Sequence, residues 1–317
     1  MEFITVAQGP VRLNVAVAGH GPLILCVHGW PELWYSWRHQ IAHFSTRGYT
    51  VAALDVRGYG GSSKPGPIEA YTMRNLALDV AAVIDRLGGG RAILVGHDWG
   101  APIAWMTALL HPGRVSAVAL LSVPYMPLGE KSFIDIMKAI YHDRFFYQIY
   151  IQDEGKAEAE VEADVPASLR KIYFAMSGSA SLNQWLAPRP RDSMLLTGLP
   201  DPQPFPDWMS QEDMQVYVEA FRTGGFRGPF NRYRAQNLDF AELQEFVGKP
   251  LTHPSCFIGG ERDMVRAFIP GVDLYQAPGV SCTDFRGSTI LSGIGHWVQQ
   301  EAPADTNAAL ERFLATL

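Results

Sequence analysis

Four short, continuous apolar runs in the first 125 residues constrain the fold most strongly. They read LILCVHG, YTVAALDV, AILVGHD and SAVALLSV. Runs of this length and composition are typical of parallel strands that are buried on both faces of a sheet. Helical periodicity fills the gaps between them, most clearly between Thr72, the expected N-cap, and Gly88, just past the last apolar position. Strands that alternate with helices predict an α/β fold, with a mostly parallel central sheet covered by helices on both faces.

The alternation of strands and helices begins after one antiparallel strand and is interrupted once. VRLNVAVAG, residues 11–19, alternates apolar and other residues, as a half-exposed strand does. From about Met126 to about Asp239 no convincing buried strand occurs, and residues 187–206 are rich in proline. The alternation resumes with a strand in SCFIGG, a further strand expected at VSCTDF and an amphipathic helix over 308–317. We therefore expect an α/β core over 1–125, a helical insertion over 126–239 and the second part of the core over 240–317.

Composition and charge exclude several classes of function. The net charge is −6 and no stripe of Lys and Arg occurs, so nucleic acid is not an expected partner. The first ten residues, MEFITVAQGP, lack the features of a signal peptide, and no apolar stretch reaches the roughly 18 residues that a membrane span needs. Three cysteines, Cys26, Cys256 and Cys282, cannot all pair within one chain, which favours free thiols in a reducing compartment. We expect a cytoplasmic protein without a membrane partner.

The segment VGHDWGA, residues 95–101, has the glycine frame of a hydrolase nucleophile elbow, with Asp98 in the place where such turns usually carry serine. Gly96 and Gly100 leave room for a tight crossing of strand and helix. The turn would present the Asp98 carboxylate beside a helix N-terminus, whose dipole stabilises the ionised form. A carboxylate held there can act as a nucleophile; the structural alternative is an aspartate that only caps the helix.

A carboxylate that attacks carbon forms an ester, which a general base and water must then cleave. Asp263 in GGERDMV and His296 in GIGHWVQQ follow Asp98 in the order acid and then base. Glu261 is an alternative to Asp263. The turn HGWP, residues 28–31, can place the backbone N–H of Trp30 beside that of Trp99 as an oxyanion hole.

Four motifs resemble those of the epoxide hydrolases that have the α/β-hydrolase fold: HGWPELWYSWRHQI, DVRGYGGSSKP, GHDWGA and GIGHWVQQEAP. The resemblance extends along essentially the whole chain. It implies that the helical insertion is a cap domain with two tyrosines, which bind and protonate the epoxide oxygen. FFYQIYIQDEGKAEAE resembles the first tyrosine segment and places that role on Tyr150; FNRYRAQN resembles the second and places it on Tyr233. Arg232 stands where the family more often has Trp, and Trp30 where it often has Phe.

The resemblance implies hydrolysis of an epoxide to a vicinal diol without a metal or cofactor. We expect the substrate to be a small apolar or aryl epoxide and the protein to be a monomer or homodimer. The insertion holds other tyrosines, Tyr141, Tyr147, Tyr173 and Tyr217, and most of them are expected to serve packing. Trp185 is one of several aromatic candidates for the pocket, and the residues expected to bind substrate are His28, Trp30, Pro31, Trp99 and Trp297.

Haloalkane and haloacid dehalogenases, which share the fold and the aspartate nucleophile, are the strongest alternative. GHDWGAP lacks the arginines that follow the nucleophile in fluoroacetate-type enzymes, and LLSVPYMPLG offers no acid directly after its strand. Trp99 does match a halide-binding position. A protein that only binds a ligand on this fold is a second alternative, although a receptor has no need of a working base.

Overall fold

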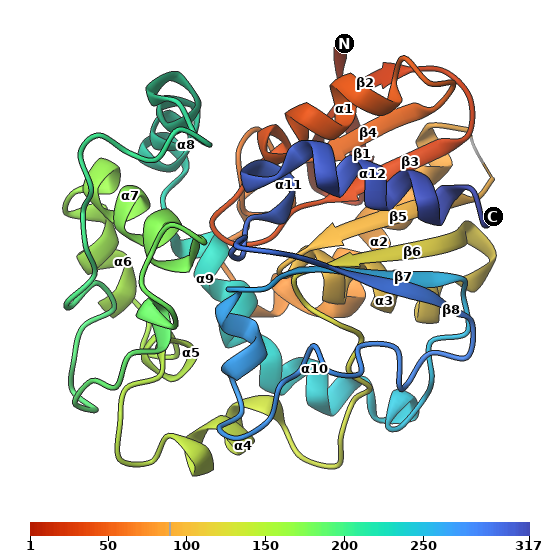
Figure 1. The fold of residues 1–317 in the computed structure, drawn as a ribbon. Helices are drawn as coiled ribbons and strands as arrows, with labels where there is room; N and C mark the ends of the chain where they lie inside the picture. Colours follow the sequence, from red (N-terminus) through yellow and green to blue (C-terminus); the bar gives the residue numbers. More distant parts are fainter. Residues whose placement is uncertain (89) are drawn as a thin grey trace.

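The computed structural model describes residues 1–88 and 90–317, and in this part an eight-stranded sheet lies beside a group of helices (Figure 1). The order across the sheet is β1-β2-β4-β3-β5-β6-β7-β8. The pairs β1–β2 and β2–β4 are antiparallel, and all other pairs are parallel. The strands are β1 Glu2–Gln8, β2 Val11–Gly19, β3 Leu23–Val27, β4 Thr50–Leu54, β5 Ala92–His97, β6 Val115–Leu121, β7 Ser255–Gly260 and β8 Phe285–Leu291.

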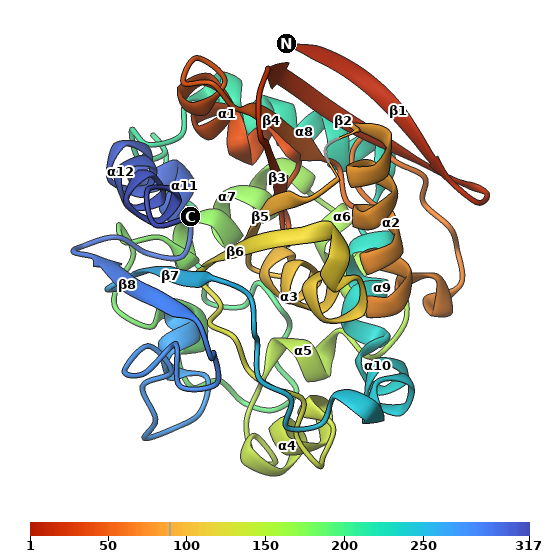
Figure 2. The same ribbon diagram turned by 90° about the vertical axis from the view of Figure 1, so that its right-hand side faces the viewer.

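Helices cover both faces of the sheet (Figure 2). Successive residues of β3 point to opposite faces, so Cys26 packs in a cluster with Phe44 and Leu310, whereas Leu25 packs in a cluster with Ile103. This two-sided burial explains why the inner strands read as unbroken apolar runs. One face is covered by α1 Arg38–Phe44, α11 Val298–Glu301 and α12 Pro303–Leu314, and the other by α2 Met73–Arg86 and α3 Gly100–Leu110.

The chain between β6 and β7 forms helices and loops and, within the described residues, adds no strand to the sheet. Most of these helices lie to one side of the sheet, where β5 ends and Asp98 follows (Figure 1). They are α4 Phe133–Ile140, α5 Tyr147–Tyr150, α6 Lys156–Glu162, α7 Val165–Met176, α8 Gln211–Gly224, α9 Arg227–Arg234 and α10 Gln236–Glu242. No helix in the described part of the chain has the length and apolar character to cross a membrane.

The predicted mostly parallel sheet with helices on both faces is confirmed, and the predicted strand over 11–19 is β2. The strand predicted at VSCTDF is wrong: β8 begins only at Phe285, because the preceding residues form turns in which Val280 is exposed. The boundaries predicted at 125/126 and 239/240 stay predictions, and α10 continues past residue 239.

Strand β5 and helix α3 cross unusually closely. A Cβ atom at Gly100 would overlap the carbonyl oxygen of Val27 in the neighbouring strand, and a Cβ at Gly96 would overlap the backbone of Gly100. Only glycine leaves this space free, so both glycines of the segment are required by the crossing itself.

We predict that Gly100→Ala lowers the free energy of unfolding by at least about 2 kcal/mol, because the added methyl group forces rigid backbone apart. Urea denaturation measures the change. Gly113→Ala is the matched control: a Cβ there meets nothing within 4 Å, so its effect should stay within about 0.5 kcal/mol. Equal effects of the two substitutions would contradict the close crossing.

Candidate active site

Asp98 occupies the turn between β5 and α3 with φ at +50°. This left-handed conformation costs energy for any residue but glycine, and such strain is often stored at functional sites. The turn directs the carboxylate away from the sheet, and the residue as a whole is only 8% exposed. Asp98 thus has the position predicted for a nucleophile at the N-terminus of a helix.

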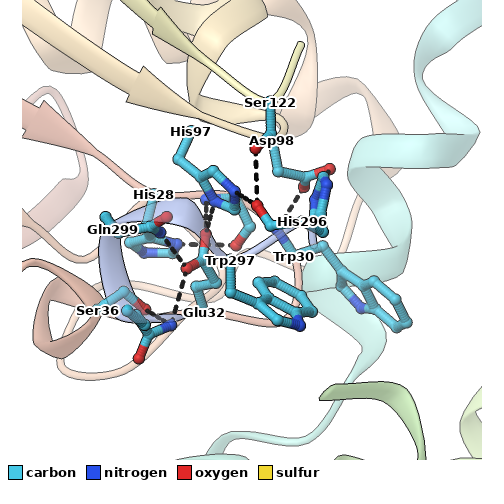
Figure 3. Close-up of polar contacts among 12 residues, drawn as sticks. His28, Trp30, Glu32, Ser36, His97, Asp98, Ser122, His296, Trp297 and Gln299 are labelled. Atoms are coloured by element: carbon cyan, nitrogen blue, oxygen red, sulfur yellow. Dashed lines mark hydrogen bonds and ion pairs between the residues drawn. The ribbon is translucent and has the colours of Figure 1, made fainter. Parts of the chain in front are cut away.

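Two backbone amides lie beside the Asp98 carboxylate. The N–H of Trp30 donates to Asp98 Oδ1 at 2.7 Å (Figure 3). A Cβ atom at Gly29 would overlap both Asp98 Oδ1 and the amide nitrogen of Trp99. The two predicted donors of the oxyanion hole therefore flank the same carboxylate, and Gly29 allows their close approach.

His296 and Asp263 complete the predicted group. His296 Nε2 lies 3.4 Å from Asp98 Oδ2, and its Nδ1 lies 3.0 Å from both carboxylate oxygens of Asp263. Asp263 also accepts hydrogen bonds from the Val265 N–H at 2.9 Å and the Tyr275 hydroxyl at 2.7 Å. The alternative acid, Glu261, instead binds Ser292 and Gly293 at the surface. The structure thus brings Asp98, His296 and Asp263 together.

The charges of the two aspartates control the protonation of His296. Burial by itself lowers the pKa of His296, but the carboxylates of Asp263 and Asp98 outweigh it and raise this pKa to about 10. In the other direction, burial raises the pKa of Asp263, while the His296 ring and the hydrogen bonds to Asp263 lower it below its ordinary value. With Asp98 ionised, the structure therefore favours the imidazolium form of His296.

A second buried pair, Glu32 and His97, lies next to this group and contacts the backbone of His296 (Figure 3). His97 Nδ1 lies 2.6 Å from Glu32 Oε2, and its Nε2 lies 2.8 Å from the carbonyl oxygen of His296. Both ring nitrogens face oxygen atoms, so the ring is fixed between Glu32 and the backbone of His296. Glu32 also accepts the Gly29 N–H at 3.0 Å, beside the Trp30 donor. His97 therefore links Glu32 to the backbone of His296 by hydrogen bonds, whereas no sequence signal distinguishes Glu32 from a surface acid.

The structure places the Tyr150 hydroxyl away from the cavity at Asp98 and places another tyrosine of the same helix in it. The Tyr150 hydroxyl donates to Glu160 at 2.8 Å and does not contribute to the cavity at Asp98. Tyr147, three residues earlier in α5, lines that cavity, and its ring centroid lies 5.8 Å from that of Tyr233. Burial and the Asp98 charge raise the pKa of Tyr147, and burial, Tyr147 and Asp98 raise that of Tyr233. Tyr147 is thus a neutral hydroxyl in the cavity that Asp98 also lines, and Tyr233, which is buried and not among the lining residues, packs against the Tyr147 ring.

A glutamine pair orients the Tyr147 hydroxyl. Gln148 Nε2 donates to the Tyr147 oxygen at 2.9 Å, which leaves the phenolic proton free to point elsewhere. Gln236 Nε2 in turn lies 3.0 Å from Gln148 Oε1 and 3.0 Å from the carbonyl oxygen of Tyr233. The pair therefore joins the two helices that carry the tyrosines.

The carboxylate opens into a cavity of about 370 Å³. Few polar residues line it: Asp98, Tyr147, Gln148, Gln236, Asp239 and Lys131. Such a cavity suits an apolar ligand whose reacting group lies at Asp98. Its apolar lining includes Trp99, Trp105, Met106, Leu109, Phe133, Ile136, Met137, Phe240, Leu243, Phe246 and Phe268.

Of the five residues predicted to bind substrate, Trp99 lines this cavity and the other four do not. His28 is buried between the Gly29 carbonyl and the Val56 N–H. The Pro31 carbonyl accepts the Tyr173 hydroxyl. Trp297 is fully buried, with its indole N–H on the Tyr173 carbonyl. Trp30 is 1% exposed and reaches Asp98 through its backbone, so these four residues serve the frame of the site.

Known proteins are similar to this chain in both sequence and fold. A family model described as alpha/beta hydrolase fold matches residues 22–264. Epoxide hydrolase A of Mycobacterium tuberculosis is 39% identical over 312 residues, which cover 97% of this chain and 95% of that protein. The structure of an epoxide hydrolase from an endophytic Streptomyces is 40% identical with a TM-score of 0.94, covering 99% of this chain and 95% of that one. Epoxide hydrolase A from Mycobacterium thermoresistibile is 37% identical with a TM-score of 0.91, covering 99% and 98%.

This chain belongs to the epoxide hydrolases. The resemblance predicted from the four motifs is thereby confirmed. In this epoxide hydrolase, Arg232 precedes Tyr233 at the position where the family more often has Trp. Its guanidinium lies 4.9 Å from the centre of the Trp99 ring and forms a buried ion pair with Asp239. The charge of Arg232 is therefore compensated locally, and the helix that carries Tyr233 is held against the cavity wall.

We predict that the His296 imidazolium of this epoxide hydrolase persists to about pH 10, because burial is outweighed by Asp263 and Asp98 in setting its pKa. Removing one charge with Asp98→Asn should lower the pH of deprotonation by at least about 1. Nitrogen-detected NMR of the histidine rings follows the titration, with the exposed His20 as an internal reference. Deprotonation at the same pH in both proteins would show that Asp98 does not act on His296.

Proposed function

We propose that this protein, as a hydrolase acting on ether bonds, converts an apolar or aryl epoxide and water to a vicinal diol through an ester on Asp98. One observation carries the proposal: a left-handed aspartate faces His296 Nε2 at 3.4 Å on one side and shares a cavity with Tyr147 on the other. Asp98 is the nucleophile, His296 the base and Asp263 the group that orients it. Tyr147 and Tyr233 are the proton donors, in place of the expected Tyr150.

In the first step, Asp98 Oδ2 attacks one carbon of the epoxide ring. Oδ1 already accepts the Trp30 N–H and becomes the carbonyl oxygen of the ester. The carbon–oxygen bond of the ring breaks as the new bond forms, and the epoxide oxygen takes a proton from Tyr147 or Tyr233. A neutral phenol can supply that proton at pH 7, whereas a phenolate cannot.

The second step uses the change in charge that the first step produces. Esterified Asp98 no longer carries a negative charge, so one of the two carboxylates that raise the His296 pKa is lost. The imidazolium then releases its proton more readily, for example to the tyrosinate, and neutral His296 can activate water. Attack on the ester carbon places the negative charge on Oδ1, where the N–H groups of Trp30 and Trp99 stabilise it. Collapse of this intermediate releases the diol and restores Asp98.

The dehalogenase alternative rests on Trp99, which lines the cavity. Two neutral hydroxyls near the carboxylate favour the epoxide instead, since ring opening needs a proton donor and halide release does not.

Two further expectations, a cytoplasmic location and a monomeric or homodimeric state, stay predictions. The three free cysteines are in accord with a reducing compartment.

We predict that His296→Gln accumulates the ester, because alkylation can proceed while the base that cleaves the ester is missing. After incubation with styrene oxide, peptide mass spectrometry should find a gain of the whole epoxide mass on the peptide that contains Asp98. The double substitution Asp98→Asn, His296→Gln is the control and should gain nothing. An adduct from a haloalkane alone would make the protein a dehalogenase.

We predict that Tyr147→Phe and Tyr233→Phe each lower the rate of alkylation by about 10- to 100-fold, and that the double substitution abolishes it, because the alkoxide loses its proton donors. Stopped-flow tryptophan fluorescence in a single turnover measures this rate. Tyr150→Phe is the matched control on the same short helix and should stay within about two-fold of the wild type. A large loss in Tyr150→Phe together with an active Tyr147→Phe would return the role to Tyr150.

A further inference from the structure

The space around Asp98 differs between its two sides. On one side the cavity extends along α3 and toward α4 and α10, with Trp99, Trp105 and Phe240 among its lining residues. In Figure 1, α4 and α10 lie together at one end of the helical group, and α7 and α8 lie toward the other end. We name this side the open arm.

The other side is filled by aromatic side chains, which we name the aromatic wall: Trp30, Trp185, Phe230, Tyr173 and Trp297. The ring centroid of Trp30 lies 6.1 Å from that of Trp185 and 6.0 Å from that of Phe230, and Tyr173 lies 4.5 Å from Trp297. These five side chains are between 0% and 2% exposed and do not contribute to the cavity lining. These five side chains therefore leave almost no free space around them in the structure.

The proton donors lie where the wall and the open arm meet. Tyr147 contacts Trp185 of the wall, with centroids 5.3 Å apart, and also lines the cavity. Tyr233 contacts Trp30 of the wall at 6.0 Å and Trp99 of the open arm at 5.2 Å. An epoxide whose oxygen is bound by these two hydroxyls would therefore lie at this junction, with one ring carbon nearer the wall and the other nearer the open arm.

The substituents of the two ring carbons diverge, so only one of them can enter the open arm. A group on the second carbon must displace packed aromatic rings, and close-packed interiors resist even small additions of volume. We infer that the enzyme selects epoxides with one bulky apolar substituent, whose second ring carbon carries nothing larger than a methyl group. This inference rests on the proposed function.

Three epoxides that share one phenyl group test the inference on the unmodified protein. Styrene oxide has an unsubstituted second carbon, trans-β-methylstyrene oxide carries a methyl group there, and trans-stilbene oxide carries a second phenyl group. We expect kcat/KM to be on the order of 100-fold or more lower for trans-stilbene oxide than for styrene oxide, with the methyl compound closer to styrene oxide.

Two tryptophan substitutions of equal size locate the restriction. Trp185→Ala opens the wall and should raise kcat/KM for trans-stilbene oxide by about 10-fold or more without a similar gain for styrene oxide. Trp105→Ala removes the same volume from the open arm and should not improve trans-stilbene oxide. The indole N–H of Trp185 has no partner in the described part of the chain, so Trp185→Leu, which breaks no hydrogen bond and leaves a smaller void, replaces Trp185→Ala if that protein does not fold.

Equal kcat/KM of the wild type for styrene oxide and trans-stilbene oxide would overturn the inference while leaving the proposed function intact. A gain for trans-stilbene oxide from Trp105→Ala but not from the Trp185 substitutions would also overturn it. Turnover of none of the three epoxides would overturn the proposed function, and the inference with it.

Discussion

The left-handed backbone of Asp98 is the constraint on which the rest of the site depends. A non-glycine residue in this conformation costs on the order of 1–3 kcal/mol, and it persists because packing on every side allows no alternative. Gly96 and Gly100 let β5 and α3 cross, and Gly29 brings a second loop against the carboxylate. The same crowding that imposes the strain therefore also places the amides of Trp30 and Trp99 at the carboxylate.

Around that residue, buried charges are arranged so that each has a partner. His296 lies between the carboxylates of Asp98 and Asp263, and His97 joins the next carboxylate, Glu32, to the His296 backbone. Glu301 accepts the N–H groups of the residues on both sides of His296, and burial raises the pKa of Glu301 to about 7 against those hydrogen bonds. Buried charges without partners would be costly; paired in this way, they fix the ring and the backbone of the base.

The sequence predicted the parts of the fold that are buried on both sides. The inner strands appear as apolar runs, whereas both edge strands are exposed and carry little signal: β1 was not predicted, and β8 was expected too early in the chain. The same holds at the site. Asp98, Asp263 and His296 were found because their order and glycine spacing follow from the topology, but Tyr147 and Tyr150 are three residues apart in one helical turn. Nothing local tells which of them faces Asp98, because the answer depends on Glu160 in the next helix.

The two functions of Trp30 connect the chemistry to the choice of substrate. Its backbone N–H holds Asp98 Oδ1, and its side chain is part of the aromatic wall, so one residue belongs both to the oxyanion hole and to the boundary of the pocket. A wall packed this tightly keeps the amide in place for the second step, because the indole ring cannot move without Trp185 and Phe230 moving as well. The substrate range is then a consequence of rigidity at the donor. Trp185 packs against the ring of Trp30, so its side chain can be reduced while the backbone of Trp30 stays where the oxyanion needs it.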